Sequence, residues 1–472
     1  MNLLLARLSV GCAAAIATPI ALVTTPSSGQ CLASKLLAPD GAADDSFGLP
    51  VAVGGGRVIV GSPRDDDNGP FSGAAYIFHP DGSSWLPEAK LIAPDGTAGD
   101  LFGLKVAISG KVAVCGADSD DALGIDSGSV YVFRRHGSHW VPEAHLVAPD
   151  GTGGDRFGVS VAVDQGLIIV GAFGDDELGS SAGAAYIFRF RGTGWTPEAK
   201  LLASDGSPGS LFGRSVAISG RTVVVGADEQ DTQGSDAGAA YVFTRIGNQW
   251  VQQARLLAAD GSAGDRFGAA VAAGRDTVLV GARFHDGVAE NAGAAYLFRR
   301  HADGWLQEAQ LLPGEGDIGD RFGSSVALRG GMALVGADLD DDRGVNAGAA
   351  YLFRRHPSGW VQSAKLVADD GADHDNFGRS VAVGHGVVVV GSPLDDDLGS
   401  ESGSVYVFAG HRGAVSCPGN VNGDQVVDVL DLIAVLASWG LPRGACPADL
   451  NSDGVVNGQD VAAVATHFGP CP

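Results

Sequence analysis

The sequence of 472 residues predicts an all-β propeller of seven four-stranded antiparallel blades, followed by a small α-helical, EF-hand-like module. Three observations lead to this fold class. The dipeptide Phe-Gly recurs every 55 residues, each 55-residue unit contains four short apolar runs, and a different, shorter repeat begins after residue 410.

The first 30 residues have the layout of a secretory signal peptide. Arg7 precedes an apolar, alanine-rich run over 8–23, and small polar residues follow it. No later apolar run approaches the roughly eighteen residues that a membrane helix needs. We therefore expect an exported protein, cleaved before Cys31, without a transmembrane segment, that is secreted or attached to the cell surface.

The composition limits the possible partners. An apolar content of 45% excludes a disordered or fibrous chain, and 72 glycines indicate many turns. The formal net charge of −24 would repel phosphate. This argues against a nucleic-acid or anionic-membrane partner.

The body of the chain is one 55-residue unit repeated seven times. Phe-Gly occurs at Phe47, Phe102, Phe157, Phe212, Phe267, Phe322 and Phe377. A tyrosine recurs at the same step, at Tyr76, Tyr131, Tyr186, Tyr241, Tyr296, Tyr351 and Tyr406. A unit such as 157–202 contains four short runs rich in Val, Ile, Tyr and Phe, separated by Gly, Asp and Ser. Four antiparallel strands, here called a to d from the axis outwards, make one blade.

The ring is expected to close with strands from both ends of the chain. A tryptophan introduces strand d in six units, but the last unit has no strand d. The matching segment lies at 34–41, so the N-terminus supplies the outer strand of the last blade. Antiparallel pairing would bring Cys31 close to Cys417, and we predict a disulfide between them. Cys115, in a strand b, is expected to be a free core thiol.

Repeats with Phe-Gly, then VGA or VGSP, then GAAYIF or GSVYVF, resemble FG-GAP repeats, the blade units of integrin α-subunit propellers and many bacterial surface proteins. The resemblance covers 32–409. It implies calcium in a D-x-D-x-D-G loop between strands a and b, but that loop is here only ISGK, DQG or RGG. The family's calcium site is therefore not expected in the propeller.

The two faces of the propeller are expected to differ in charge. The b–c and d–a loops share one face, and the b–c loops carry acidic runs such as 65–67, 175–177 and 395–397. The c–d turns of the opposite face carry arginine pairs such as Arg134 and Arg135. The acidic runs are interpreted as exposed loops that favour solubility. Calcium sites are the alternative, although the runs lack the spaced oxygen ligands of known calcium loops.

A catalytic site would have to depart from the repeat. At 283–286 an Arg-Phe-His-Asp sequence replaces the acidic run, and Phe71 and Phe173 place aromatics on the same face. This basic, aromatic notch could contact a ligand, but surface loops also tolerate sequence drift. The motif H-E-x-x-H does not occur. We therefore expect no enzymatic activity, and we assign no catalytic or cofactor-binding residues.

A second repeat, with an offset of 29, follows a linker at 410–416. Two loops, 420–431 and 449–460, have oxygen side chains at positions one, three, five, nine and twelve, and position seven would offer its carbonyl. The predicted ligands are Asn420, Asn422, Asp424, Val426, Asp428 and Asp431, then Asp449, Asn451, Asp453, Val455, Asn457 and Asp460. This spacing wraps each loop around one Ca²⁺, and an amphipathic helix follows each loop. The tail is expected to bind about two calcium ions.

Paired loop–helix units with Asp at position twelve resemble type I dockerin repeats, over residues 417–472. The resemblance implies a module that folds with calcium and docks onto a cohesin domain of another protein. It assigns partner recognition to loop positions ten and eleven, which are Val429 and Leu430, then Gly458 and Gln459.

The two tail units are not equivalent. Gly454 permits positive φ at the loop turn where the first unit has Gln425, so we expect the second site to bind calcium more tightly. Cys446 and Cys471 bracket the second unit, and a disulfide between them is expected to close it.

We therefore expect an exported, non-enzymatic binding or adhesion protein. Its propeller would present loops to an unknown glycan or protein ligand, and its tail would dock to a cohesin-like partner or the cell surface. One alternative is an extracellular hydrolase or lyase acting on polysaccharide or phosphoester at the propeller face, which needs catalytic residues in the 283–286 notch. The other is a passive surface-layer spacer, which predicts no saturable ligand.

Overall fold

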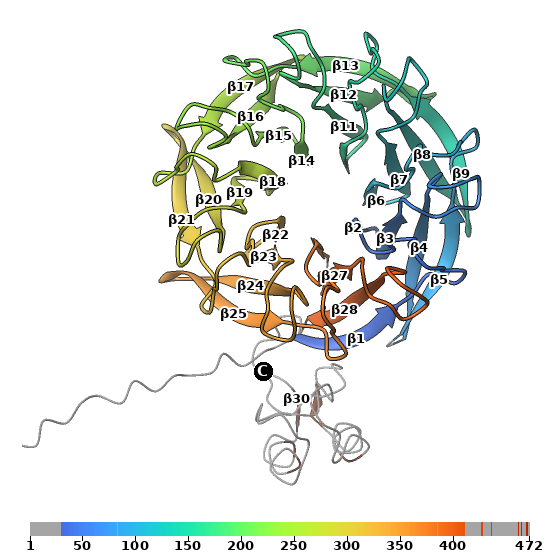
Figure 1. The fold of residues 1–472 in the computed structure, drawn as a ribbon, viewed down its shortest axis with the longest axis vertical. Coiled ribbons are helices and arrows are strands. Elements are labelled where there is room, and N and C mark those ends of the chain that lie inside the picture. The colour runs from blue at the N-terminus through green and yellow to red at the C-terminus, as the bar shows by residue number, and fades with distance from the viewer. Residues whose placement is uncertain are drawn as a thin grey trace, which may run out of the picture.

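The computed structural model describes residues 30–82, 84–384 and 386–410, with a few isolated positions beyond them. Its main body consists of seven four-stranded antiparallel sheets arranged radially around a central axis (Figure 1). The prediction of a seven-bladed propeller is confirmed. Blades are numbered 1 to 7 in chain order, beginning with the sheet that contains residues 51–91.

The inner half of each blade consists of strands a and b. The strands a, nearest the axis, are β2 (Val51–Gly54), β6 (Lys105–Ser109), β10 (Ser160–Asp164), β14 (Ser215–Ser219), β18 (Phe267–Ala273), β22 (Ser325–Arg329) and β26 (Ser380–Val383). The strands b are β3 (Arg57–Ser62), β7 (Val112–Ala117), β11 (Leu167–Ala172), β15 (Thr222–Ala227), β19 (Thr277–Ala282), β23 (Met332–Ala337) and β27 (Val387–Ser392).

The outer half consists of strands c and d. The strands c are β4 (Ala74–Asp81), β8 (Ser129–His136), β12 (Ala184–Phe190), β16 (Ala239–Ile246), β20 (Ala294–His301), β24 (Ala349–His356) and β28 (Ser404–Gly410). The strands d are β5 (Ser84–Leu91), β9 (His139–Leu146), β13 (Trp195–Leu201), β17 (Gln249–Leu256), β21 (Gly304–Leu311), β25 (Gly359–Leu366) and β1 (Gln30–Leu36).

The hydrophobic pattern of each strand follows its place in the blade. Strand β11, with the sequence LIIVGA, is buried at every position because neighbouring blades cover both of its faces. Strand β5, with the sequence SWLPEAKL, exposes Leu86, Pro87 and Ser84 because no further blade layer lies outside it. The continuous apolar runs of strands b therefore indicate burial on two sides.

The repeated Phe-Gly joins successive blades. Phe102 is fully buried and packs edge-on against Tyr131 and Phe133, with ring centroids 5.5 and 6.0 Å apart. The next residue, Gly103, has φ of 85°, and a Cβ there would lie 2.2 Å from the carbonyl oxygen of Ala74 in the preceding blade. The phenylalanine fills the core, and the glycine allows the backbones of two blades to approach.

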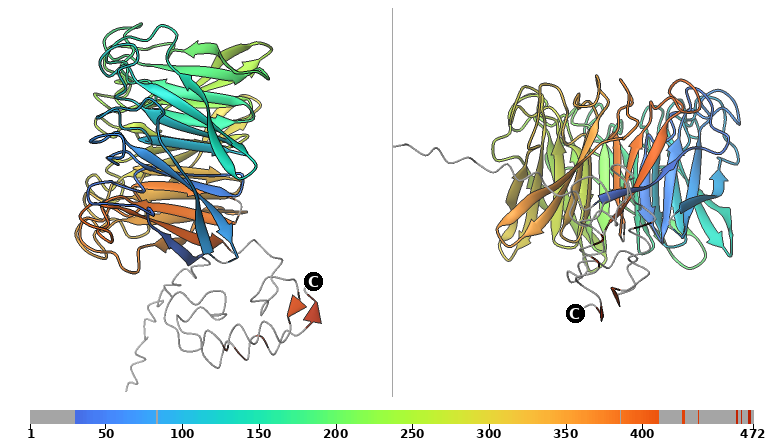
Figure 2. Two further views of the ribbon diagram at one scale, coloured as in Figure 1. Left: turned by 90° about the vertical axis from the view of Figure 1, so that its right-hand side faces the viewer. Right: turned by 90° about the horizontal axis from the view of Figure 1, so that it is seen from below.

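The N-terminal strand closes the ring as predicted. Strand β1 pairs antiparallel with β28, from Gln30 opposite Gly410 to Leu36 opposite Val405 (Figure 1). Figure 2 shows the same closure from two further sides. Cys115 is buried as a free thiol, as expected, and burial raises its pKa. The predicted disulfides involve Cys417, Cys446 and Cys471, which lie outside the described residues, as does the side chain of Cys31.

The predicted calcium loops, helices and partner-recognition residues of the tail also lie outside the described residues, apart from isolated positions. Four of these form a short antiparallel pair, β29 (Val426–Val427) and β30 (Gly469–Pro470). In the part of the chain that the structure describes, no helix is both long and apolar enough to cross a membrane.

Candidate functional site on the loop face

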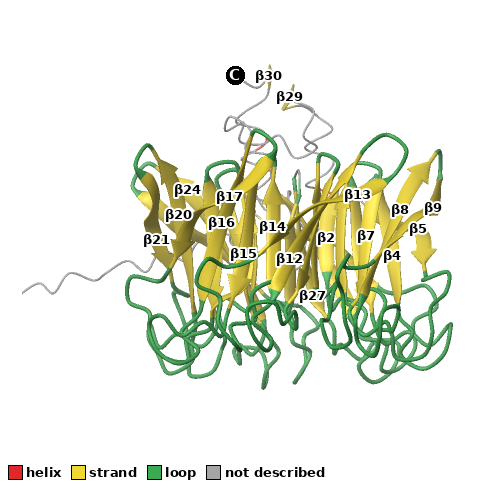
Figure 3. Cartoon of the chain, turned by 90° about the horizontal axis from the view of Figure 1, so that it is seen from above, coloured by secondary structure: helices red, strands yellow, loops and turns green. Residues whose placement is uncertain are grey.

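The longer connections gather on one side of the propeller. Figure 3 shows the b–c and d–a loops, in green, below the strands, and the short a–b and c–d turns above them. We call these two sides the loop face and the turn face. The predicted separation of the two classes of loop is confirmed.

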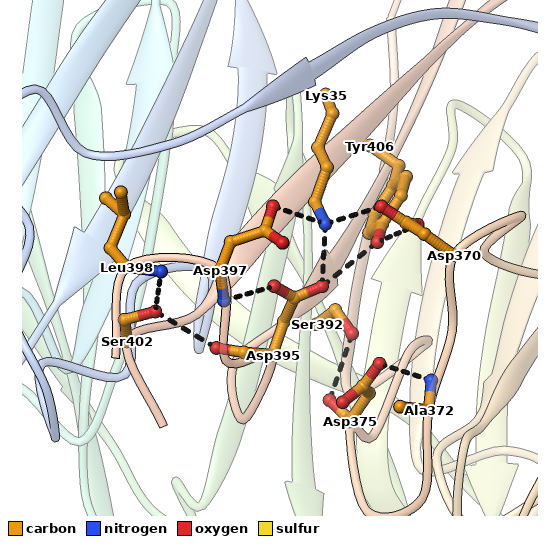
Figure 4. A network of polar contacts seen from close by, with 10 residues as sticks. All are labelled: Lys35, Asp370, Ala372, Asp375, Ser392, Asp395, Asp397, Leu398, Ser402 and Tyr406. Atoms are coloured by element: carbon orange, nitrogen blue, oxygen red, sulfur yellow. Dashed lines mark hydrogen bonds and ion pairs between the residues drawn. The ribbon is translucent and has the colours of Figure 1, made fainter. Parts of the chain in front are cut away.

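Beneath the loop face of blade 7, a lysine sits among three carboxylates. Lys35 Nζ lies 2.8 Å from Asp370, 2.9 Å from Asp395 and 2.7 Å from Asp397 (Figure 4). The Tyr406 hydroxyl is shared between Asp370 and Asp395, at 2.7 and 3.1 Å, and the ammonium lies 5.1 Å from the centre of its ring. The Lys35 ammonium thus joins four parts of the blade, namely strand d, strand c, the b–c loop and the d–a loop.

This Lys–Tyr network recurs in four blades, and it corrects our interpretation of the acidic runs. The lysines are Lys90, Lys200, Lys365 and Lys35, in blades 1, 3, 6 and 7. In each of these blades the first aspartate of the run is buried, as Asp65 is at 3% exposure, although we expected exposed loops. The sequence contained a signal for this pairing, because a lysine follows the tyrosine by fourteen residues in blades 1, 3 and 6.

The network keeps its lysine charged. Burial alone would lower the pKa of Lys35, but hydrogen bonds to Asp370, Asp397 and Asp395 raise that pKa above its ordinary value. Among the described residues, no group of three or more His, Cys, Asp or Glu side chains is arranged to hold a metal ion. Because three carboxylates converge on the Lys35 ammonium within 2.9 Å, this ammonium occupies the position that a cation shared by them would need.

Blade 5 uses a histidine in the network, which corrects the predicted notch. His285 is only 7% exposed, and its Nδ1 lies 2.9 Å from Asp265 Oδ2. The hydrogen bond to Asp265 raises the pKa of His285, against the effect of burial. Its Nε2 lies 3.3 Å from Gln310, the residue at the lysine position. His285 therefore replaces the aspartate of the other blades and is not an open catalytic group beside Arg283.

Neighbouring loops are bonded into a continuous ring. The backbone N–H of Leu101 donates to Phe71, at 3.1 Å, and that of Phe102 donates to Ser72, at 3.0 Å, so a b–c loop supports the next d–a loop. The same bonds connect Ser46 and Phe47 to blade 7, which closes this ring also. Within the described residues, the loops of this face thus form one hydrogen-bonded ring rather than seven separate loops.

The turn face is less basic than predicted, because its arginines are paired. Glu88 lies 2.5 Å from both Arg57 and Arg135, and it also accepts a 3.2 Å hydrogen bond from Trp140. Glu198 contacts Arg189 and Arg245, and its hydrogen bond with Arg189 lowers its pKa to about 2. The strand-d glutamates therefore neutralise most of the arginine pairs that the sequence places in the c–d turns.

Near the axis, the loop face departs from the repeat. The residue after strand b is Pro63, Asp118, Phe173, Asp228, Arg283, Asp338 or Pro393, according to the blade, whereas Phe-Gly and Tyr occur in all seven. We define the axial cluster as Lys105, Arg214, Arg283 and Arg379, with Asp228 and Asp338. All six residues stand at the loop-face ends of the two inner strands.

The charges of the axial cluster are close but incompletely paired. Asp228 is 1% exposed and lies 3.7 Å from Arg214 and 3.9 Å from Arg283, yet neither of its carboxylate oxygens has a hydrogen-bond partner among the described residues. Asp338 pairs with Arg379 at 3.1 Å through one oxygen, and its other oxygen has no hydrogen-bond partner in the part of the chain that the structure describes. Buried polar atoms of this kind usually bind water or a ligand.

Lys105 adds a titratable cation to the cluster. Lys105 is exposed as a residue, but neighbouring protein atoms limit the hydration of its ammonium, and Arg379 and Arg214 repel its charge. Desolvation, followed by this repulsion, lowers the pKa of Lys105 to about 8. Of the two predicted aromatics, Phe173 contributes here, because Arg214 lies over its ring, 5.5 Å from the centre. The axial cluster is therefore the best candidate for a binding site on this face.

Known proteins resemble the chain over this propeller. The FG-GAP repeat model matches it seven times, over 32–78, 85–133, 140–188, 195–243, 250–298, 305–353 and 360–408. Integrin alpha-11 of Homo sapiens is 30% identical over 139 residues, which are 26% of this chain and 11% of that protein. Integrin alpha-6 of Gallus gallus is 32% identical over 158 residues, which are 31% of this chain and 14% of that protein. The match thus spans less than a sixth of either relative.

Among solved structures, a chain of the one entitled "Crystal Structure of Mitotic Checkpoint Complex" aligns over 87% of this chain and 99% of its own length. The TM-score is 0.49 and the sequence identity 11%.

Proposed function

Because the chain belongs to the FG-GAP repeat family, we propose that it is an exported, non-enzymatic binding or adhesion protein. Its loop face holds a ligand at the axial cluster, and its calcium-dependent, dockerin-like tail docks to a cohesin-like partner or to the cell surface. The matches to two integrin alpha chains support a binding role for the propeller.

One observation carries the proposal for the propeller. Phe-Gly and the tyrosine occur in all seven blades and the Lys–Tyr network in four, whereas the residue after strand b is aspartate in three blades and proline, phenylalanine or arginine in the others. A residue present in all blades serves the fold, so a specific site is expected where the repeat breaks. At that place Asp228 and Asp338 keep buried carboxylate oxygens without hydrogen-bond partners beside three arginines.

The chemistry of the axial cluster suits a polar ligand. The guanidinium groups can donate several hydrogen bonds, in a fixed plane, to acceptors of a ligand. The free carboxylate oxygens can accept hydrogen bonds from donors of the same ligand. A glycan or an exposed protein segment offers both kinds of group. An acidic ligand should bind more weakly as the pH rises through about 8, because Lys105 then loses its charge.

For the tail, the proposal rests on the spacing of oxygen ligands at 420–431 and 449–460. Calcium, when bound, would supply the charge around which each loop folds. Val429, Leu430, Gly458 and Gln459 would then meet the partner. Because the two pairs differ, the two repeats are not expected to bind the partner equivalently.

The propeller proposal can be tested by binding the labelled full chain to arrays of glycans and extracellular proteins. We expect at least one saturable ligand, and Arg379→Gln should weaken its binding at least tenfold. Lys111→Met, which removes one charge from the turn face, is the control and should leave the affinity unchanged. If no ligand saturates, the protein is a spacer, and turnover of a substrate on the array would identify an enzyme.

The tail proposal can be tested by capturing the full chain on an immobilised type I cohesin in calcium and in EDTA. Capture should require calcium, and Asp453→Ala should reduce it more than Asp424→Ala. Equal losses in the two variants would contradict the predicted difference between the sites. If capture fails in calcium although both loops bind the metal, the tail has another partner.

A further inference from the structure

A pocket of about 350 Å³ opens on the turn face, opposite the loop face. Blades 3, 4 and 5 contribute to it. Its lining includes Arg221, from the turn between β14 and β15, Arg275 and Asp276, from the turn between β18 and β19, and Arg300, from β20. Three arginines and one aspartate give this pocket a positive charge in a chain whose net charge is −24.

The repeat explains why Arg300 has no carboxylate partner within the described residues. In three other blades, the arginine at the same position pairs with a glutamate 47 residues earlier. The pairs are Arg135 with Glu88 at 2.5 Å, Arg245 with Glu198 at 3.1 Å and Arg355 with Glu308 at 3.2 Å. For Arg300 that position is Gln253, whose amide instead donates to Val251 O, at 3.4 Å.

The other two arginines stand at turn positions that are glycine in most blades. The position of Arg275 is glycine in blades 1, 2, 4 and 6, and that of Arg221 is glycine in blades 1, 3, 6 and 7. Among the described residues, Arg221, Arg275 and Arg300 form no ion pair, although most arginines of the turn face do. Three departures from the repeat thus converge on one concavity.

We propose that this pocket is a binding site for an oxyanion, namely a phosphoryl, sulfuryl or carboxylate group carried by a small molecule or a polymer. Guanidinium groups bind such oxygens in pairs, and their weak hydration makes the exchange of water for an anion favourable. The Ser219 and Thr222 hydroxyls on the same wall can donate further hydrogen bonds, and Asp276 can accept one from a hydroxyl next to the anion. The volume suits one sugar or one phosphoester group.

This site is independent of the axial cluster, because the two lie on opposite faces and share no residue. A ligand polymer could therefore contact one face without the other. The failure of one proposal leaves the other intact.

The test is titration of the full chain with inorganic sulfate, inorganic phosphate and glucuronate at constant ionic strength. Binding is measured by calorimetry and by the shift of the thermal unfolding midpoint. We expect saturable binding of at least one anion. Gln253→Glu is the sharpest variant, because it restores the missing carboxylate, should pair with Arg300 and removes no arginine. It should weaken anion binding at least fivefold, and Arg300→Gln should do the same.

The control is Arg343→Gln, which removes one positive charge from an exposed position on the loop face and should leave anion binding unchanged. Preference for phosphate would identify a phosphoryl ligand, preference for sulfate a sulfuryl ligand, and preference for glucuronate an acidic sugar. The proposal is overturned if none of the three anions binds saturably. It is equally overturned if Gln253→Glu binds the anion as tightly as the natural chain.

Discussion

At the residue scale, the lysine of strand d allows the first aspartate of the acidic loop in its blade to be buried. Asp65 and its equivalents would repel one another if they were buried without a cation, yet they are buried. In four blades, a lysine ammonium lies within 3 Å of several carboxylates and balances their negative charge. The same ammonium lies over the ring of the repeated tyrosine. The runs are therefore part of the fold as well as of the surface.

Replacement of this lysine should cost stability. In Lys200→Met, the carboxylates of Asp150, Asp175 and Glu177 lose the ammonium that lies within 2.8 Å of each. We expect a loss of roughly 2 kcal/mol in the free energy of unfolding, measured by urea denaturation. Lys111→Met is the control, because this exposed lysine has no ion-pair partner among the described residues. Equal stabilities for the two variants would show that the network contributes nothing.

Another repeated aspartate should make stability depend on pH. Asp320 accepts a hydrogen bond from the backbone of Asp317, and desolvation raises its pKa from 3.8 to about 6, with a further contribution from Asp340. The folded state then binds more protons than the unfolded state between these two values, so this group lowers stability as the pH rises through the window.

Asp320→Asn removes that titration and keeps an acceptor for the backbone N–H. We expect the stability of the variant, relative to the natural chain, to increase between pH 4 and pH 7. Urea midpoints at four pH values would measure this. The exposed Asp303→Asn is the control and should show no such trend, and a flat difference for Asp320→Asn would refute the assignment.

At the scale of the elements, much of the fold could be predicted from the sequence. Periodicity located the four strands of each blade, and the missing strand d of the last blade indicated closure by the N-terminus. The cross-strand partners could not be found in the same way. Lys90 meets Asp65 across 25 residues, and Arg135 meets Glu88 across 47 residues and two blades. Such pairs depend on the register and on the contact between blades, which a hydrophobic pattern does not contain.

The contact between blades leaves no space for a side chain at one glycine of strand b. A Cβ at Gly171 in β11 would lie 1.8 Å from the carbonyl oxygen of Gly213 in the next blade. Gly171→Ala should therefore separate two backbones and destabilise the protein by about 3 kcal/mol. A Cβ at Gly194 would have no other atom within 4 Å, so Gly194→Ala should be nearly neutral. Thermal unfolding of both variants measures the difference in their stability. A small difference would contradict the close packing of the blades.

At the scale of the whole molecule, the two faces differ in construction. The loop face is a bonded ring over buried Lys–Tyr networks, and its variation lies at the axial cluster. The turn face is neutralised by Arg–Glu pairs, and its variation lies at one pocket in blades 3 to 5. The sequence pointed to Arg283 and His285 as one notch, but these side chains separate, because one faces the axial cluster and the other joins the network of blade 5.

We propose that the lysines of the propeller neutralise its acidic loops and that calcium binds only to the tail. Calorimetric titration with calcium, of the full chain and of a chain ending at Ser416, tests it most directly. We expect about two ions in the full chain and none in the shorter one. Calcium retained by the shorter chain would contradict it, because the acidic loops would then bind metal despite the lysines that occupy them.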